Sequence, residues 1–415
     1  MTGHRSLGRA QMAGVFAVFA FAYFFSALVR AVTATLAPVF SAELGLASAQ
    51  LGLLAGAYFL GFSVMQLPLG SALDRWGAKR VLMAHLLVAV AGCLAFAAAG
   101  SLPQLLLARF LIGVGVAACL MAPLTCFRHL YSHALQLRAN SWMLMTGSLG
   151  MLASTLPVQW LLPVIGWRGL FVLVAVLLAV ALLLIWRFVP ADAARPGADP
   201  APGDGYRQVF RHAAFVRMAP MGFFVYGGMV AMQSLWIGPW LTQVAGFSAA
   251  DAARGLFIVN LSMLAAFFSW GLLMPRLIRI GWAGERLIAW AWWPGVACLA
   301  WIVWQGAAAG PGWWALWCVL TSVVSLSQPA VGQAFPAALA GRALSAFNLL
   351  IFAGVFSLQW GIGLGIDALL ARGASVLEAY RWAFGGFLLA CLGSFVWRQA
   401  WAAPGRPDAG AVAGR

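Results

Sequence analysis

The sequence predicts an all-α membrane protein with twelve transmembrane helices in two pseudo-symmetric six-helix bundles. Of its 415 residues, 63% are hydrophobic and 8% are charged, which leaves too few polar residues to coat a soluble protein of this size. Twelve apolar runs each come close to or exceed the roughly 20 residues with which an α-helix crosses a bilayer. Because the runs are apolar throughout, they do not match the alternating pattern of a transmembrane barrel strand.

The apolar runs form two groups of six, separated by a polar stretch. The first group covers residues 12–38, 51–73, 81–100, 103–127, 141–163 and 168–189. The second covers residues 218–243, 254–275, 286–308, 312–337, 345–369 and 380–401. Prolines and glycines keep the start of the polar stretch from folding, whereas residues 206–217 predict a short basic surface helix. We therefore expect an N-terminal bundle over 1–189, a cytoplasmic linker over 190–217, a C-terminal bundle over 218–402 and a cytoplasmic tail over 403–415.

The basic residues concentrate on one side of the predicted membrane. Nineteen of the 25 Lys and Arg residues fall on the side of the N-terminus, against four on the other side, Arg168, Arg254, Arg372 and Arg381. Because cytoplasmic loops carry an excess of bases, both termini are expected in the cytoplasm. The net charge of +15 comes from loops rather than from a soluble basic module, so membrane lipid is an expected partner and nucleic acid is not. One lysine against 24 arginines is typical of a high-GC bacterial genome, which indicates a bacterial inner membrane.

The cysteines and the N-terminal run indicate neither a cofactor nor a cleaved leader. All six cysteines lie within apolar runs and lack metal-ligand spacing, so we expect them to pack among apolar side chains, with no metal or other cofactor. The run over 12–38 is longer than a signal-peptide core and has no convincing cleavage site, so we expect it to remain as the first helix.

The two halves carry a weak internal repeat. Gly45-Leu-Ala-Ser-Ala-Gln precedes the second predicted helix, and Gly246-Phe-Ser-Ala-Ala-Asp precedes the eighth, an offset of 201 residues. Gly70 and Gly271, near the ends of those two helices, share this offset. The segment after Gly271 lacks an acidic residue, so we expect the cytoplasmic ends of the two halves to be held differently.

A charged segment lies between the second and third predicted helices. Its informative residues are Gly70, Asp74, Arg75, Gly77, Lys79 and Arg80. We expect a short polar loop in which Gly70 and Gly77 give the backbone freedom to turn, and in which the bases pair with acids or lipid headgroups. The pattern Gly-x-x-x-Asp-Arg-x-Gly-x-Lys-Arg resembles the loop between helices 2 and 3 of the major facilitator superfamily (MFS) of transporters. An ordinary positive-inside anchor is the alternative.

Further segments resemble the same family over nearly the whole chain. Arg109-Phe-Leu-Ile-Gly113-Val-Gly115 is similar to its helix-4 signature, an arginine followed by closely packing glycines. The fifth helix lacks the Gly-Pro pair of proton-linked drug antiporters, which argues against drug efflux. The resemblance implies a substrate site near the membrane midplane, between two halves that rock against each other.

The resemblance also implies a cytoplasmic gate. In the family, the loop acid contacts the cytoplasmic start of helix 11, which here lies near Ser345. The free N–H groups of a helix start favour a negative partner, so Asp74 would hold the inner gate shut. Replacing Asp74 by Asn is expected to slow transport and to leave substrate affinity nearly intact.

Arg30 is the most informative residue for a substrate site. It lies well inside the first predicted helix, where a permanent charge is costly, and shares one face with Tyr23, Ser26 and Thr33. A guanidinium binds carboxylate or phosphate through paired hydrogen bonds, so this face is a candidate anion site. The helix resembles that of the organic-anion and organophosphate branch of the family. The alternative is a structural arginine bound by helix carbonyls or polar side chains.

Polar residues on other predicted helices are candidates for the remaining pocket lining. In the seventh helix, Gln233 and Trp236 fall on a face with Tyr226, Met229 and Trp240, and a packing face is the alternative. The other candidates are isolated amides and a tyrosine, any of which could instead bond a neighbouring helix: Tyr58, Gln66, Asn348 and Gln359.

The intramembrane charges bear on energy coupling. Arg109 lies in the fourth helix, where packing and charge transfer are equally good explanations. No Asp or Glu occurs in the middle of a predicted helix, and Asp367 at the outer end of helix 11 could be merely interfacial. Proton-coupled carriers use embedded carboxylates, so coupling to protons is disfavoured.

These features together predict a secondary active transporter of a small organic anion, a carboxylate, that works by alternating access as a monomer. A drug or metabolite exporter is the alternative within transport. The sequence has five histidines, none of them mid-helix, and no nucleophile–base pair, which argues against an enzyme. It also offers no soluble output domain of the kind that a sensor would normally add. Copper(I) transport would use soft ligands near helices 4 and 5, namely Cys119, Met121, Cys126, His129, Met143, Met145 and Met151.

Overall fold

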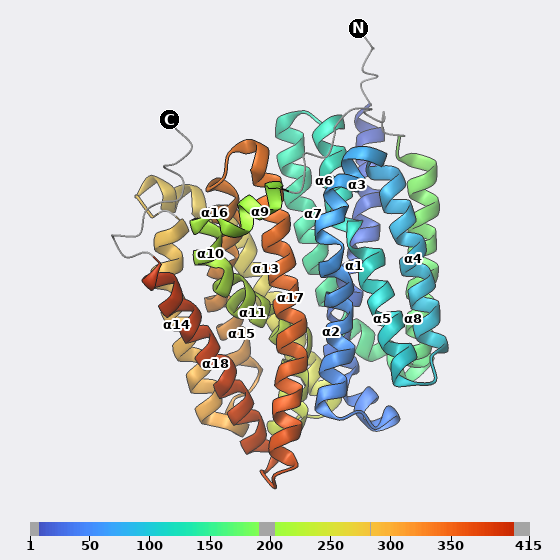
Figure 1. Ribbon diagram of the computed structural model, residues 1–415. Helices are drawn as coiled ribbons and strands as arrows, with labels where there is room; N and C mark the ends of the chain where they lie inside the picture. The colour runs from blue at the N-terminus through green and yellow to red at the C-terminus, as the bar shows by residue number, and fades with distance from the viewer. Residues whose placement is uncertain (1–7, 191–203, 283, 402–415) are drawn as a thin grey trace. The chain divides into compact units, whose positions relative to one another are not determined.

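The computed structural model describes residues 8–190, 204–282 and 284–401, which are almost entirely helical and contain no strand (Figure 1). The expected all-α fold is therefore confirmed. The first part of the chain forms α1 (Arg9–Leu44), α2 (Ser48–Val64), α3 (Gln66–Trp76), α4 (Ala78–Ala98), α5 (Leu102–Val116), α6 (Ala118–Leu130), α7 (His133–Ala153) and α8 (Leu156–Phe188). The second part forms α9 (Asp204–Arg211), α10 (Ala213–Pro220), α11 (Gly227–Ala231), α12 (Ile237–Pro239), α13 (Ala249–Arg279), α14 (Gly284–Gln305), α15 (Pro311–Thr321), α16 (Ser327–Gln333), α17 (Ala337–Leu370) and α18 (Val376–Ala400).

Each predicted apolar run corresponds to helical segments. Within the described ranges, ten helices are long and apolar enough to cross a membrane, and eleven if the bent pair α2–α3 counts as one span. α7 is not among them, but a short turn at Ser154 and Thr155 joins it to the start of α8. Gly166, with φ 64° and ψ 175°, interrupts α8. The helix expected at 141–163 is thus α7 plus the start of α8, and the helix expected at 168–189 is the rest of α8.

The seventh expected span contains wide helical turns. It runs from Ala213 to Val244, and its α-helical pieces are separated by π-helical turns at Met221–Tyr226, Met232–Trp236 and Trp240–Val244. In a π-helical turn the hydrogen bonds span one residue more than in an α-helix, so side chains drift from the 3.6-residue spacing.

The charged segment after α2 is mostly helical, which corrects the expectation of a loop. α2 bends by 44° at its junction with α3, and α3 continues through Asp74. Gly70 lies inside α3 with open space around it, and Gly77 alone forms the turn, with φ 81°. The loop was expected from the loss of apolar residues, but a helix that leaves the bilayer can continue as an amphipathic turn.

α17 begins earlier than expected. The apolar pattern starts at Ser345 because Gly341 and Arg342 interrupt it, yet the helix begins at Ala337. The expectation that Ser345 lies at a helix start with free N–H groups is therefore wrong, because those groups belong to the first turn of α17.

The basic helix expected at 206–217 is present as two short helices, α9 and α10. The first turn of α9 packs on α17, where a Cβ on Gly205 would overlap the Arg342 guanidinium. Tyr206 Oη lies 3.5 Å from the Leu67 carbonyl oxygen, and burial raises the pKa of Tyr206. The expected unfolded start of the linker, residues 191–203, and the expected tail from residue 403 lie outside the described residues.

Contacts divide the chain into two compact units. The first contains the described residues of Met1–Val32 and Pro68–Pro200, and the second those of Thr33–Leu67 and Ala201–Arg415. The end of α1 and all of α2 therefore belong to the unit of the C-terminal part of the chain, in which α2 packs mainly against α17. The bundles expected at 1–189 and 218–402 follow the sequence repeat and stay a prediction.

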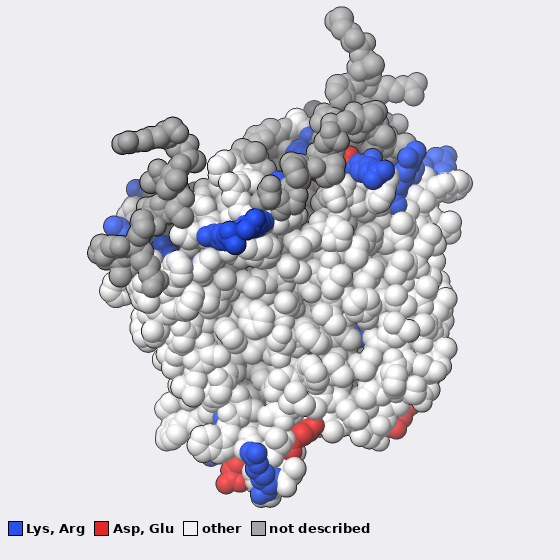
Figure 2. All heavy atoms as spheres, viewed as in Figure 1, with Lys and Arg blue, Asp and Glu red and all other residues white. Residues whose placement is uncertain are grey.

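The surface of each unit matches a lipid environment. On the face shown in Figure 2, Lys and Arg gather near helix ends, and the long middle carries almost no charge. Large apolar side chains are exposed on the helices of both units, among them Leu183, Trp186, Trp382 and Leu389. Unlike a soluble protein, the helices are apolar on their outward faces as well as their inward ones.

Candidate substrate site and gates

Three residues of the polar stripe of α1, Tyr23, Ser26 and Arg30, lie in the first unit, and Thr33 belongs to the second. Tyr23 and Ser26 are buried, and Arg30 is half-buried. The thiol of Cys119 on α6 lies beside Ser26 and within electrostatic range of Arg30. The stripe therefore brings a guanidinium, a hydroxyl and a thiol together in an otherwise apolar part of the unit, and such a cluster can bind an anion through charge and hydrogen bonds.

Two glycines of α7 allow that helix to pack closely against this part of α1. A Cβ on Gly147 would approach Tyr23 Cε1 to 2.5 Å, and one on Gly150 would overlap the Phe24 carbonyl oxygen. The Tyr23 ring therefore packs closely on α7, as small residues allow between membrane helices.

Arg109 lies against the backbone of α1, next to Arg30. It is 1% exposed, and its Nη2 donates to the Val29 carbonyl oxygen at 3.0 Å. The guanidinium also lies 6.0 Å from the ring centroids of Phe96 and Phe171. Of the two roles considered for Arg109, this geometry favours packing.

The glycine run after Arg109 packs closely, as its signature implies. A Cβ on Gly115 would overlap the backbone of Ala89 on α4. For Gly113, the structure shows a buried position in α5.

Two predicted amides of the second unit bond side chains that the sequence did not single out. Gln233 Nε2 donates to Asn260 Oδ1 at 3.0 Å, and Gln359 Nε2 donates to Ser234 Oγ at 3.0 Å. Gln359 is fully buried, and its Oε1 has no hydrogen-bond partner among the described residues. The side chains of the neighbouring residues Gln233 and Ser234 thus bond residues of two different helices, α13 and α17.

The remaining polar candidates of this unit lie on α2, α3 and α17. Asn348 Oδ1 accepts from Gln328 Nε2 at 2.7 Å, and Gln66 Nε2 donates to the Phe62 carbonyl at 3.2 Å. Tyr58 is fully buried, and its ring stacks on Phe62 with centroids 6.2 Å apart.

Trp236 belongs to an aromatic cluster inside the second unit. Its ring meets Tyr380 edge-on at 6.2 Å, and Trp240 stacks on Phe384 at 5.1 Å. Trp240 Nε1 donates to the Ala309 carbonyl at 3.1 Å. This arrangement matches the packing alternative considered for this face of the helix.

The charged residues around Gly77 differ in their contacts. Asp74, Arg75 and Arg80 are exposed. Lys79 Nζ donates to the carbonyl oxygens of Trp186 and Val189, both at 2.7 Å, so it binds the C-terminal end of α8. Lys79 thus has a structural contact that the sequence did not predict, and the expectation that the bases pair with acids or lipid headgroups stays a prediction.

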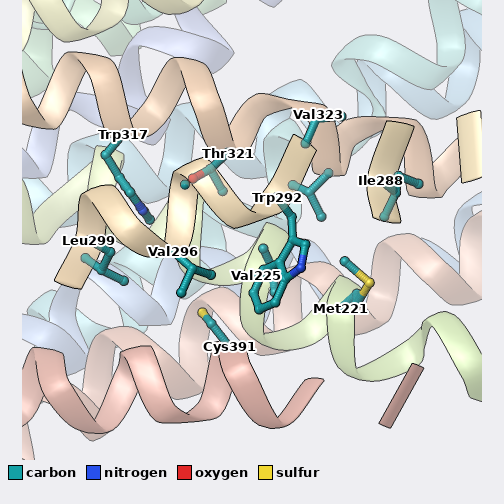
Figure 3. Close-up of a pocket in the computed structure, with 12 residues that line it drawn as sticks. Met221, Val225, Ile288, Trp292, Val296, Leu299, Trp317, Thr321, Val323 and Cys391 are labelled. Carbon is teal, nitrogen blue, oxygen red and sulfur yellow. The ribbon is translucent and has the colours of Figure 1, made fainter. Parts of the chain in front are cut away.

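A small cavity in the second unit lies away from every predicted site residue. Met221, Val225, Trp292, Thr321 and Cys391 are among the residues that line it (Figure 3). Its volume of ≈ 20 Å³ suits one water molecule and not an organic substrate.

The soft ligands considered for copper differ in their exposure. Cys119, Cys126 and Met143 are fully buried, whereas Met145 is 43% exposed. Over the described ranges, no three His, Cys, Asp or Glu side chains lie together as metal ligands. The six cysteines are buried and free, as expected for packing residues.

Comparison with known proteins identifies the family. A family model described as Major Facilitator Superfamily matches residues 19–358. The chain belongs to the major facilitator superfamily. This MFS chain is 30% identical over 155 residues to the 4-hydroxybenzoate transporter PcaK of Acinetobacter baylyi, which covers 37% of this chain and 34% of PcaK. It is 28% identical over 163 residues to the multidrug transporter MdfA of Yersinia pestis, which covers 39% of this chain and 40% of MdfA. The matches thus span less than half the length of either relative.

The MFS fold is also seen in solved structures. A bacterial homologue of the human lysosomal transporter Spinster matches with a TM-score of 0.73 at 16% identity, covering 96% of this chain and 100% of that one. At 16% identity, this likeness shows only that the two chains share a fold. Together with the family match, it shows that the chain has the MFS fold.

Proposed function

We propose that this MFS transporter carries a small organic anion, a carboxylate, and that Arg30 binds its charge. The observation that carries the proposal is the stripe of α1, which places the half-buried Arg30 beside the buried Ser26. A guanidinium at this depth is costly to bury, and it binds a carboxylate through paired hydrogen bonds. A carboxylate substrate would supply a matching charge. The match to a 4-hydroxybenzoate transporter supports this substrate class.

Within the second unit, Gln359 is the amide best suited to the substrate. Its buried Oε1 can accept a hydrogen bond from a hydroxyl or N–H group of the cargo. Gln233 and Trp236 already have protein neighbours, so we assign them a supporting role.

A multidrug exporter is the second candidate, favoured by the match to MdfA at similar identity. An exporter of hydrophobic cations would not depend on Arg30, since a fixed cation repels such cargo. The two candidates therefore differ in the charge of the ligand and in the effect of one substitution.

Thermal stabilisation of the purified protein tests the proposal. The panel contains 4-hydroxybenzoate, small dicarboxylates, inorganic phosphate, tetraphenylphosphonium and neutral sugars, because a specific ligand raises Tm by mass action. We expect a carboxylate to stabilise the wild type and Arg80→Gln, which alters an exposed arginine. Arg30→Gln should weaken binding about tenfold or more, the usual effect of losing a charged hydrogen bond. Equal stabilisation of all three proteins by tetraphenylphosphonium would support the exporter instead.

We also propose that the monomer lies in a bacterial inner membrane with both termini in the cytoplasm. The excess of bases on the side of the N-terminus supports this orientation. A reporter that is active only in the cytoplasm, fused after Arg415, should be active. A reporter active only outside should work after Arg372, and the reverse pattern would overturn the orientation.

A further inference from the structure

Asp367, near the end of α17, binds the first turn of α2. Its Oδ1 accepts the Ser48 backbone N–H at 3.0 Å, and its Oδ2 accepts the Ala49 backbone N–H at 2.7 Å. Both N–H groups lie at the start of a helix, where they have no acceptor within the helix and where the dipole favours a negative charge. One carboxylate therefore accepts hydrogen bonds from two backbone donors that lie 319 and 318 residues away in the sequence.

The contact continues along both helices. A Cβ on Gly363 of α17 would overlap the Ser48 carbonyl, and a Cβ on Gly52 of α2 would overlap the carbonyl of Gln359. Two turns further, Phe59 stacks on Phe352 with centroids 6.1 Å apart. The carboxylate thus closes one end of a tightly packed α2–α17 interface.

Two other helix starts on the same predicted side of the membrane are capped by local side chains, whereas those of α5 and α15 have no side-chain cap. The Ser375 hydroxyl and the Glu378 carboxylate cap α18, and Ser248 with Asp251 does so for α13. The N-cap of α2 is Ala47, which has no side-chain acceptor. α2 therefore depends on a carboxylate from another helix, and this cap is lost whenever the two helices separate.

We propose that Asp367 is a latch that holds the outer end of α2 against α17 and is released when the transporter opens outward. In the repeat, α2 belongs to the first half of the sequence and α17 to the second. Alternating access in this family moves one half against the other, so the α2–α17 contact must break in each cycle. The assignment of this end to the outside rests on the orientation proposed above, whereas the latch itself does not depend on the anion.

Thiol labelling of a buried position tests the latch. Ala55 lies on the α2 face that contains Gly52, Gly56 and Phe59, and it is 1% exposed. In Ala55→Cys protein in intact cells, a membrane-impermeant maleimide should react slowly. Adding Asp367→Asn should raise the reaction rate about tenfold, because charged hydrogen bonds to the backbone are lost. Protein without Ala55→Cys measures the background from the six buried native cysteines.

Matched variants separate the latch from general damage. Asp251→Asn removes an acid whose partners among the described residues are Ser248, at its own helix start, and Arg254, so it should leave labelling unchanged. Ser48→Pro removes one of the two donors at a position where proline suits a helix, since Ala47 already has φ −67° and ψ 166°. It should raise labelling in the same direction as Asp367→Asn, whereas Ser48→Ala, which keeps the N–H, should not.

The labelling rates of the Asp367 and Ser48 variants decide whether the latch exists. If Asp367→Asn does not accumulate in the membrane, the comparison of Ser48→Pro with Ser48→Ala carries the test. Wild-type labelling rates in both Asp367→Asn and Ser48→Pro would overturn the latch. Faster labelling of both variants in inverted vesicles but not in intact cells would keep the latch and overturn the orientation.

Discussion

At the scale of single residues, several polar side chains within the spans bond partners on neighbouring helices. Gln233 meets Asn260, Gln359 meets Ser234, and Tyr380 Oη donates to Gln243 Oε1 at 2.9 Å. In a membrane the alternative to such a bond is an unpaired polar group in hydrocarbon, so each bond helps to fix which helices meet.

Tyr380→Phe should lower the free energy of unfolding by about 1 kcal/mol, since it removes one hydrogen bond and leaves Gln243 Oε1 without that donor. Tyr380 is 1% exposed, so water does not readily replace the lost partner. Thermal unfolding in detergent measures the change. Tyr206→Phe is the control, because its hydroxyl makes only a 3.5 Å contact, and an equal loss in both variants would contradict the assignment.

The sequence could identify which polar residues lie inside the membrane, but not what they bind. Spacing placed Ser26 and Arg30 on one face because both lie in one regular helix. It did not pair Gln359 with Ser234, because the two lie 125 residues apart. The role of Asp367 was missed for the same reason, since its partners are backbone groups of α2.

At the scale of elements, glycines determine how closely the helices approach. In α5, a Cβ on Gly115 would overlap the Ala89 backbone, which cannot move as a flexible side chain would. Gly385 of α18 has nothing within 4 Å of the corresponding position. A side chain in place of glycine would therefore clash with a neighbouring helix at Gly115 of α5 and meet no atom at Gly385 of α18.

Gly115→Ala should destabilise the protein by about 1–3 kcal/mol, as overpacking does. Gly385→Ala should be neutral or stabilise it by up to about 1 kcal/mol, because alanine favours the helix. Tm values of the two variants in the same detergent provide the comparison. A loss at Gly385 equal to that at Gly115 would show that close packing of the glycine does not explain the result, since helix propensity alone favours alanine at both positions.

Helix existence was predictable at this scale, and helix breaks were not. Long apolar runs must be helical because every backbone group needs a partner in the bilayer. The bend after Val64, the early start of α17 and the helical path around Gly70 depend on neighbouring helices and on polar turns beyond the apolar run. The π-helical turns near Gln233 also shift side chains off the regular spacing that was used to define its face.

At the scale of the whole molecule, the repeat and the contacts group the chain differently. The repeat assigns α2 to the first half, whereas contacts place Thr33–Leu67 with the C-terminal part. A transporter that alternates between two openings must exchange such contacts during its cycle. Asp74 and Asp367, at opposite ends of the predicted spans, are the two acids that we assign to holding these states.

Asp74→Asn should slow transport several-fold and leave ligand affinity nearly unchanged, because Asp74 is exposed in α3 and outside the proposed site. Uptake of the carboxylate found in the thermal panel measures the rate, and the Tm shift measures affinity. Asp251→Asn serves as the control for loss of one surface acid. Weaker binding with a normal rate would show that Asp74 is not a gate.

Lys79 offers a natural proteolytic reporter of local opening. It is the single lysine of the chain, and its ammonium is held by the carbonyl oxygens of Trp186 and Val189. A lysine-specific protease therefore has one target bond, in the first turn of α4. Cleavage requires this turn to unwind and release the ammonium. When the turn recloses faster than the protease cuts, the cleavage rate is proportional to the population of the open form. One cut, at one place, would report how often the start of α4 leaves the end of α8, without any engineered label.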